Sequence, residues 1–399
     1  MRVFCIIDGL GDKPCKVLNG KTPLEYARIY NLNYLARNGK TGIVYTVQPN
    51  FVPQSDQGVL SLLGYNLDKI YTERGPLEAV GANIEFSNGD LAFRANFATV
   101  YKGKLIDRRV GRNLTTKEAE ILAKDINRNI KLDIGFEFKH TIEHRAVLVL
   151  KKNQGVILNN KVSNVDSEYS GTLNCRALNR NAICTAGIIN EFLTKSKELL
   201  QDHKINKLRE KKGLLAANFI LLRGAGNQLP ILKKKKNWCA VLNMPLEIGI
   251  GRLCGMHILK VPSLDLKRDL YKNLYNKLEF IIKNAKKAIK KNSYDVYYIH
   301  FKEIDIPGHD NRPKDKAKML EILDKKFFSF LKNLKNVEII VTGDHSTPCE
   351  LRKHSADPVP ILWYGHGNDN VLEFNENSCK NGELGELFGN EVLSICRWE

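Results

Sequence analysis

The feature that most constrains this chain is a group of carboxylate and imidazole side chains placed directly after predicted strands near its C-terminal end. Apolar runs at 296–301 and 339–341 predict two buried strands. The ligand-type residues that follow them are Asp305, His309, Asp344, His345 and His354. The carboxyl ends of strands in an open α/β sheet face one crevice, so these side chains are expected to converge. Their nitrogen and oxygen donors suit Mn²⁺, Zn²⁺ or Mg²⁺, and the pattern predicts a metal site.

Another strand is predicted at the N-terminus, where the apolar run from Val3 to Ile7 ends at Asp8. The GLGD sequence that follows allows a tight turn against a ligand. Asp8 is therefore a further candidate metal ligand, with a plain loop-capping role as the alternative. Asp12 is expected to be such a local cap.

The segment 52–66 is expected to contain a short helix that is capped by Ser55 or Asp56. Its apolar face would consist of Val59, Leu62 and Leu63, with Gly64 just past its end. A hydroxyl at a helix N-terminus faces unpaired N–H groups and the positive end of the helix dipole, where a phosphoryl group can bind. Ser55 is thus either a structural cap or a phosphoryl acceptor.

Length and composition indicate an ordinary globular protein. The chain has 399 residues, enough for two domains, with 43% hydrophobic and 27% charged residues. Its formal net charge of +18 leaves three interpretations: a lysine-rich solvated surface, attraction of a phosphate substrate, or nucleic-acid binding. No zinc finger, RNP motif or basic zipper is visible, which argues against nucleic acid.

Cysteine usage and the pattern of apolar runs bear on the cellular compartment. The nine cysteines are scattered and form no CxxC pair, which predicts reduced thiols in a cytoplasmic protein. No apolar run has the length of a signal peptide or a transmembrane helix, so no membrane association is expected.

A change in the sequence pattern near Tyr71 predicts a second domain. Short alternating strands punctuated by Gly, Asn and Asp follow, as is typical of an antiparallel sheet. The basic run from Lys233 to Asn237 is expected to be a solvated connector back to the first domain. The predicted organisation is an α/β core, residues 1–72 and 237–399, interrupted by an α+β cap domain, residues 73–236.

The predicted cap carries candidate binding residues for an anion. Guanidinium groups pair with carboxylate or phosphate oxygens in bidentate geometry, although surface salt bridges are the alternative for any single arginine. The residues singled out are Asp107, Arg108, Arg109, Arg112 and Arg145. In the core, Lys302 beside the Asp305 loop is a candidate phosphate contact, with a surface salt bridge as the alternative.

The motifs DGLGD, GHD, TGDHSTP and HSADPVP occur in this order along the chain. In this arrangement the sequence resembles the archaeal type of cofactor-independent phosphoglycerate mutase, in the alkaline phosphatase superfamily. The resemblance implies an alkaline-phosphatase-like sandwich core with a central, mostly parallel sheet and an inserted cap. It also implies interconversion of 3-phosphoglycerate and 2-phosphoglycerate through a phosphoserine, as in glycolysis and gluconeogenesis.

The resemblance further implies two divalent metal ions, with Mn²⁺ preferred over Mg²⁺, Co²⁺ or Zn²⁺. One ion would be held by Asp305, His309 and His354. The other would be held by Asp8, Ser55, Asp344 and His345, and Ser55 would become phosphorylated. On the substrate side, the implied residues are Arg74, Asp107, Arg108, Arg145 and Arg223. Asp107 would serve as acid and base, and the arginines would hold the substrate.

Two segments depart from the pattern of the resembled family. They are Asn164 to Gly171, where Asp166 alone matches, and Val261 to Asp269. Both departures concern substrate contacts rather than metal ligands. They leave a metal-dependent phosphomonoesterase of the same superfamily as the alternative activity.

Overall fold

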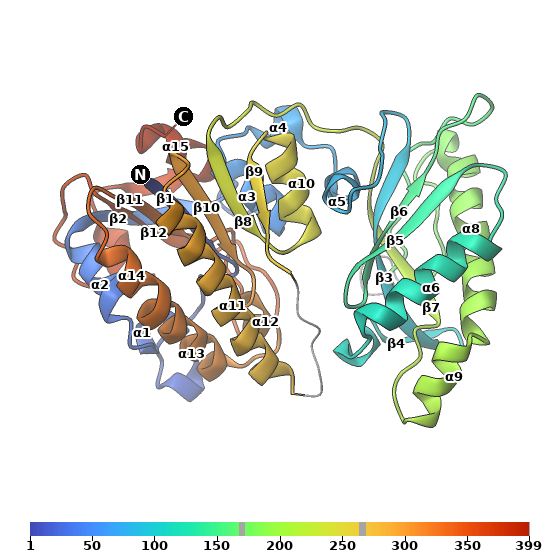
Figure 1. Cartoon of the computed structure of the whole chain (residues 1–399), viewed down its shortest axis with the longest axis horizontal. Helices are drawn as coiled ribbons and strands as arrows, with labels where there is room; N and C mark the ends of the chain where they lie inside the picture. The colour runs from blue at the N-terminus through green and yellow to red at the C-terminus, as the bar shows by residue number, and fades with distance from the viewer. Residues whose placement is uncertain (167–171, 263–268, 399) are drawn as a thin grey trace.

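The computed structural model describes residues 1–166, 172–262 and 269–398, which form two lobes, each with its own sheet (Figure 1). Most of the two departing segments, 164–171 and 261–269, lies outside the described residues.

The larger lobe is built on an eight-stranded sheet in the order β13-β2-β12-β11-β1-β10-β8-β9. The strands are β1 (Arg2–Ile7), β2 (Gly39–Tyr45), β8 (Trp238–Leu242), β9 (His257–Lys260), β10 (Val296–Phe301), β11 (Glu338–Thr342), β12 (Val359–Tyr364) and β13 (Gly385–Phe388). Strand β12 runs antiparallel to β11 and β2, and every other neighbouring pair is parallel. The predicted α/β class with a mostly parallel sheet is confirmed.

Helices cover both faces of this sheet, because its central strands are apolar on both sides. In β1, Val3, Cys5 and Ile7 pack toward α2, α11 and α13, whereas Phe4 and Ile6 pack toward α3, α10 and α15. The helices of this lobe are α1 (Pro23–Tyr26), α2 (Tyr30–Arg37), α3 (Ser55–Leu62), α4 (Leu67–Ile70), α10 (Pro245–Leu253), α11 (Leu270–Lys291), α12 (Asp305–His309), α13 (Pro313–Leu323), α14 (Ser329–Lys332) and α15 (Val392–Ile395). Of the helices in the described residues, none has both the length and the apolar character needed to cross a membrane.

The smaller lobe contains the antiparallel sheet that the sequence predicts after Tyr71. Its strands are β3 (Leu91–Tyr101), β4 (Lys104–Asp107), β5 (Phe136–Ile142), β6 (Arg145–Leu150) and β7 (Phe219–Gly226), and every pairing is antiparallel. The helices α6 (Thr116–Asn129), α8 (Ile183–Gln201) and α9 (Lys204–Lys211) cover one face, and α5 (Arg74–Gly81) contacts the other (Figure 1). The boundaries at 72/73 and 236/237 stay predictions.

The connector between the lobes differs from its prediction at Lys235. This residue is only 8% exposed, and its Nζ lies 5.8 Å from the ring centroid of Tyr65 and 5.5 Å from that of Trp238. The prediction that the whole run is solvated is therefore wrong at this position. A lysine whose stem lies on aromatic rings buries its methylene groups, and composition alone does not reveal such a contact.

Helices α5 and α10 meet through glycines at the junction of the lobes. A Cβ on Gly81 would lie 1.7 Å from the carbonyl oxygen of Pro245, and one on Gly249 would lie 1.9 Å from that of Leu77. Helix α5 also packs on the sheet of the smaller lobe through Ala79. Close backbone approach at these glycines therefore sets how α5 joins the two lobes.

We predict that Gly249→Ala lowers the free energy of unfolding by about 2 kcal/mol, because the new methyl group would collide with backbone rather than with a movable side chain. Gly187→Ala in α8 is the matched control, since nothing lies within 4 Å of its Cβ position. It should stabilise by roughly 0.5 kcal/mol through helix propensity. Urea denaturation of both variants measures the difference, and equal shifts would contradict the packing argument.

Candidate metal and phosphate site

A cavity of about 200 Å³ lies between the two lobes. Its lining on the side of the larger lobe includes Asp8, Ser55, Lys302, Asp305, His309 and His354. These residues follow β1, begin α3, or follow β10 and β11, so the carboxyl edge of the sheet forms one wall. The opposite wall is rich in arginines of the smaller lobe.

Asp305, His309 and His354 form the first group of possible metal ligands. Asp305 and His309 are the two ends of α12, one turn apart, and His309 Nε2 lies 3.3 Å from Asp305 Oδ2. The Nδ1 atoms of His309 and His354 each lie 2.9 Å from a backbone carbonyl, of Arg352 and Pro53 respectively. These contacts direct both Nε2 atoms toward Asp305, as is usual for metal-binding imidazoles.

Asp8, Asp344 and His345 form the second group. Asp8 follows β1 and Asp344 follows β11, its parallel neighbour, so pairing of the strands brings both carboxylates together. His345 Nε2 lies 3.1 Å from Asp8 Oδ1 and 3.5 Å from Asp344 Oδ2. Ser55 Oγ lies 3.3 Å from the same nitrogen. Ser55 is thus within a side chain's reach of this group.

The second group and the adjacent His300 contain buried polar atoms that make no hydrogen bond. Asp8 Oδ1, Asp344 Oδ2 and His300 Nε2 have no hydrogen bond, although all three residues are at most 1% exposed. Burial and the neighbouring Asp8 carboxylate raise the pKa of Asp344 to about 7. Buried carboxylate oxygens without a hydrogen bond are costly, and a divalent cation between Asp8 and Asp344 would offset that cost. The oxygen and nitrogen donors present therefore fit a divalent metal ion.

The N-terminus of α3 differs from its prediction in a way that bears on Ser55. Gln54 is the N-cap, and its backbone N–H donates to Gln57 Oε1 at 2.9 Å. Asp56 instead accepts a hydrogen bond from the hydroxyl of Tyr71 at 2.6 Å. The prediction of Ser55 or Asp56 as the cap is wrong, and the Ser55 hydroxyl faces His345 instead.

Lys302 is enclosed within the site rather than engaged in a surface salt bridge. Its ammonium pairs with Asp8 and lies 3.0 Å from Glu247 Oε1. Burial opposes the charge on Lys302, but the Asp8 and Glu247 carboxylates raise its pKa above the usual range. Lys302 thus supplies positive charge at the wall of the cavity beside Asp8.

The opposite wall carries excess positive charge. The predicted arginines that line it are Arg74, Arg108, Arg109, Arg112, Arg145 and Arg223, joined by Arg94. Asp166 pairs with Arg108 and lies 3.8 Å from Arg223. Glu78 pairs with Arg74 at 2.5 Å and lies 3.8 Å from Arg94. Because Arg74 and Arg94 share one carboxylate, an anion in the cavity would meet positive charge on this wall.

Two predicted substrate residues are already engaged in the structure. Arg112 forms a bidentate pair with Asp310, with both N···O distances at 2.8 Å, and so joins the lobes. Asp107 does not line the cavity, and its Oδ1 accepts from the backbone N–H groups of Arg109 and Gly111. Their roles toward substrate stay predictions.

Arg94, His144 and Glu303 also line the cavity but were not singled out from the sequence. Arg94 had a usable signal, because it shares one face of β3 with Asn96 while their neighbours are apolar. His144 had none. Burial and the neighbouring Arg145 lower the pKa of His144 well below its usual range, which favours the neutral imidazole.

Comparison with known proteins gives a consistent result. A family model described as 2,3-bisphosphoglycerate-independent phosphoglycerate mutase matches residues 36–206. A relative of that name from Thermococcus gammatolerans is 39% identical over 405 residues, covering 98% of this chain and 95% of its own. Among solved structures, a protein from Pyrococcus horikoshii is 32% identical with a TM-score of 0.79, covering 99% of this chain and 95% of its own. A cofactor-independent phosphoglycerate mutase from Thermoplasma acidophilum is 32% identical with a TM-score of 0.61, covering 99% and 98%. The chain therefore belongs to the 2,3-bisphosphoglycerate-independent phosphoglycerate mutase family of isomerases.

Proposed function

We propose that this protein interconverts 3-phosphoglycerate and 2-phosphoglycerate by passing the phosphoryl group through Ser55. The observation that carries the proposal is the position of the Ser55 hydroxyl. It lies 3.3 Å from His345 Nε2, at one wall of a cavity whose other wall is lined by arginines. A nucleophile and an anion-binding surface thus face the same space, as phosphoryl transfer requires.

Two divalent cations, with Mn²⁺ as the proposed ion, complete the site. Asp305, His309 and His354 would hold one, and Asp8, Ser55, Asp344 and His345 the other. Such ions supply positive charge that lowers the pKa of a bound hydroxyl and offsets the charge of phosphate oxygens. Ser55 Oγ then forms a bond to phosphorus while the bond to the glycerate oxygen breaks, and the reverse transfer goes to the other hydroxyl.

The arginines of the smaller lobe would retain glycerate between the two transfers. Arg108, Arg145 and Arg223 would hold the carboxylate and phosphate groups through bidentate pairs. Asp107 would carry the hydroxyl protons, which requires its loop to move toward the cavity when substrate binds. Lys302 would contact a phosphate oxygen from the opposite wall.

Exclusion of water distinguishes a mutase from a phosphomonoesterase. Arg112 of the smaller lobe pairs with Asp310 of the larger, and Lys277 in α11 pairs with Glu143 at 2.7 Å. Arg112, Lys277 and Glu143 all line the cavity. These bridges hold the lobes together at the site, so that water has less access while Ser55 carries the phosphoryl group. The closed arrangement favours the mutase.

We expect Ser55→Ala to lower isomerisation by about 1,000-fold or more, because the nucleophile is lost. Ser61→Ala, in the same helix but outside the cavity lining, should retain activity. With labelled 3-phosphoglycerate, 2-phosphoglycerate should form in preference to free phosphate. Full isomerase activity in the Ser55 variant would remove the mechanism, and free phosphate as the main wild-type product would favour the phosphomonoesterase.

A second prediction concerns the bridge between the lobes. Asp310→Asn should raise the ratio of free phosphate to 2-phosphoglycerate several-fold, because Arg112 loses its charged partner and water enters more often. Asp315→Asn removes a carboxylate that pairs with Arg312 in the larger lobe alone, and it should leave the ratio unchanged. A loss of metal would lower both products together, so an unchanged ratio in Asp310→Asn would contradict the role of the bridge.

A third prediction concerns the metal ions. Removal of divalent ions with EDTA should abolish isomerisation, and Mn²⁺ should restore it. Mn²⁺ at 100 times its dissociation constant should also raise the free energy of unfolding by about 2.7 kcal/mol per site. The Asp344→Asn variant should lose most of the Mn²⁺-dependent increase in unfolding free energy that one site contributes. The His257→Gln variant, changed on the exposed strand β9, should keep it. Thermal unfolding with and without Mn²⁺ measures this, and equal gains in both variants would refute the assignment.

A further inference from the structure

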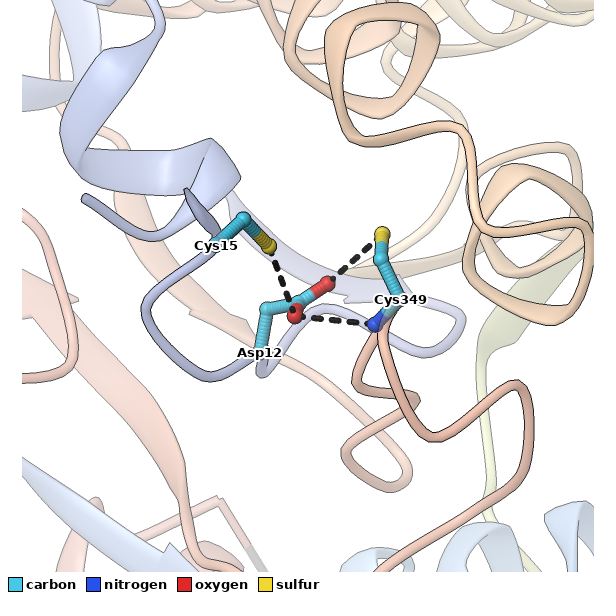
Figure 2. Close-up of side chains that lie close together, drawn as sticks. All are labelled: Asp12, Cys15 and Cys349. Atoms are coloured by element: carbon cyan, nitrogen blue, oxygen red, sulfur yellow. Dashed lines mark hydrogen bonds between the residues drawn. The ribbon is translucent and has the colours of Figure 1, made fainter. Parts of the chain in front are cut away.

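Asp12, Cys15 and Cys349 form a buried cluster away from the cavity lining (Figure 2). The Cys15 thiol lies 3.8 Å from Asp12 Oδ1, and the Cys349 thiol donates to Asp12 Oδ2 at 3.1 Å. One ligand-type atom from each residue lies within 4.8 Å of the others. Both cysteines are 0% exposed. Residues 334 positions apart in the sequence thus place two thiols side by side.

The cluster resembles a metal site in composition, but its hydrogen bonding differs from that of the Asp8 group. Lys316 Nζ donates to Asp12 Oδ2 at 2.7 Å and to the carbonyl oxygens of Gly11 and Thr347 at 3.1 Å each. Asp12 Oδ1 accepts from the backbone N–H groups of Lys13 and Cys349. Both carboxylate oxygens of Asp12 are therefore satisfied, and a buried ammonium already occupies the cation position. This arrangement disfavours a metal ion and leaves the two thiols as the reactive groups.

The two thiols lie in two loops that also carry metal-ligand candidates. Cys15 lies in the loop after β1, which begins at Asp8. Cys349 lies two residues after Thr347, whose hydroxyl donates to Asp305 Oδ1 at 2.7 Å and lies 3.0 Å from His345 Nδ1. A covalent link between the thiols would therefore fix the spacing of both loops.

We propose that Cys15 and Cys349 are a modification site at which a peroxide converts the two thiols into a disulfide. The Cys15 sulfur, as thiolate, attacks a peroxide oxygen, which gives a sulfenic acid and releases hydroxide that takes up the proton lost by the thiol. The Cys349 sulfur then attacks the Cys15 sulfur, the S–S bond forms and water leaves. In total, two thiols and one hydrogen peroxide give one disulfide and two waters.

The order of attack follows from the surroundings of each thiol. The neighbours of Cys15 in its loop, Lys13, Lys16 and Val17, are exposed, so opening of this surface loop admits the oxidant. Contact with Cys15 and burial raise the pKa of the Cys349 thiol, which suits the resolving rather than the attacking role. The sulfurs must approach to about 2.05 Å, which requires the same loop to move.

The test uses the full chain with Cys184→Ser, because Cys184 is the exposed cysteine whereas the other eight are buried. After hydrogen peroxide treatment, free thiols are alkylated and peptides are analysed by mass spectrometry. We expect a Cys15–Cys349 linked peptide that lacks two hydrogen atoms and disappears with dithiothreitol. Oxidation should also raise the thermal unfolding midpoint by about 5 °C, because a crosslink across a long loop restricts the unfolded chain.

Two variants keep the proposal open to refutation. Cys349→Ser and Cys15→Ser should lose both the linked peptide and the shift in midpoint while they remain folded in reducing buffer. Absence of the linked peptide under conditions that fully oxidise Cys184 in the wild-type chain would overturn the proposal. Stoichiometric Zn²⁺ retention that depends on Cys15 but persists in Asp344→Asn would also overturn it, in favour of a metal site. Both readouts are independent of isomerase activity.

Discussion

The burial of two carboxylates at the ends of neighbouring strands is the constraint on which the rest of the site depends. The parallel pairing of β1 with β11 places Asp8 and Asp344 at the same edge of the sheet, and both are at most 1% exposed. Like charges in such a place repel each other, and burial adds to the cost. Lys302 and His345 hold the pKa of Asp8 below its usual range against burial, whereas Asp344 keeps a raised pKa. The charge of this wall is thus only partly balanced by the protein itself.

The two walls of the cavity carry side chains that attract opposite charges. The sheet edge presents carboxylates and imidazoles, which attract cations, and the smaller lobe presents guanidinium groups, which attract anions. Under the proposed function, a phosphorylated substrate would lie between bound cations and guanidinium groups, so that its charge would be neutralised from both sides. Residues of both lobes are therefore needed, and the glycine contact of α5 with α10 matters because it sets how the lobes are joined.

The metal-ligand candidates could be predicted from sequence because strand ends are encoded locally. The buried runs before Asp8, Asp305 and Asp344 mark where parallel strands stop, and the stops of parallel strands share an edge. The cap of α3 could not be predicted, because the Gln57 side chain accepts from the backbone N–H of Gln54, and this contact competes with the better-known capping residues. The ion pairs of Arg112 and Lys302 depend on the packing of distant segments, about which a single sequence carries no local signal.

Lys302 and Lys316 show how hydrogen bonding distinguishes two side-chain clusters of similar composition. Lys302 neighbours carboxylate oxygens that make no hydrogen bond, and its side chain is 16% exposed at the cavity. Lys316 is 0% exposed and is held by three oxygens, and its partner Asp12 has both oxygens satisfied. The two clusters therefore differ in charge balance. The cluster of Asp8, Asp344 and His345 is only partly balanced, whereas the Asp12 carboxylate is neutralised by Lys316. Asp8 and Asp12 are only four residues apart in the loop after β1, yet Asp12 alone is paired with Lys316.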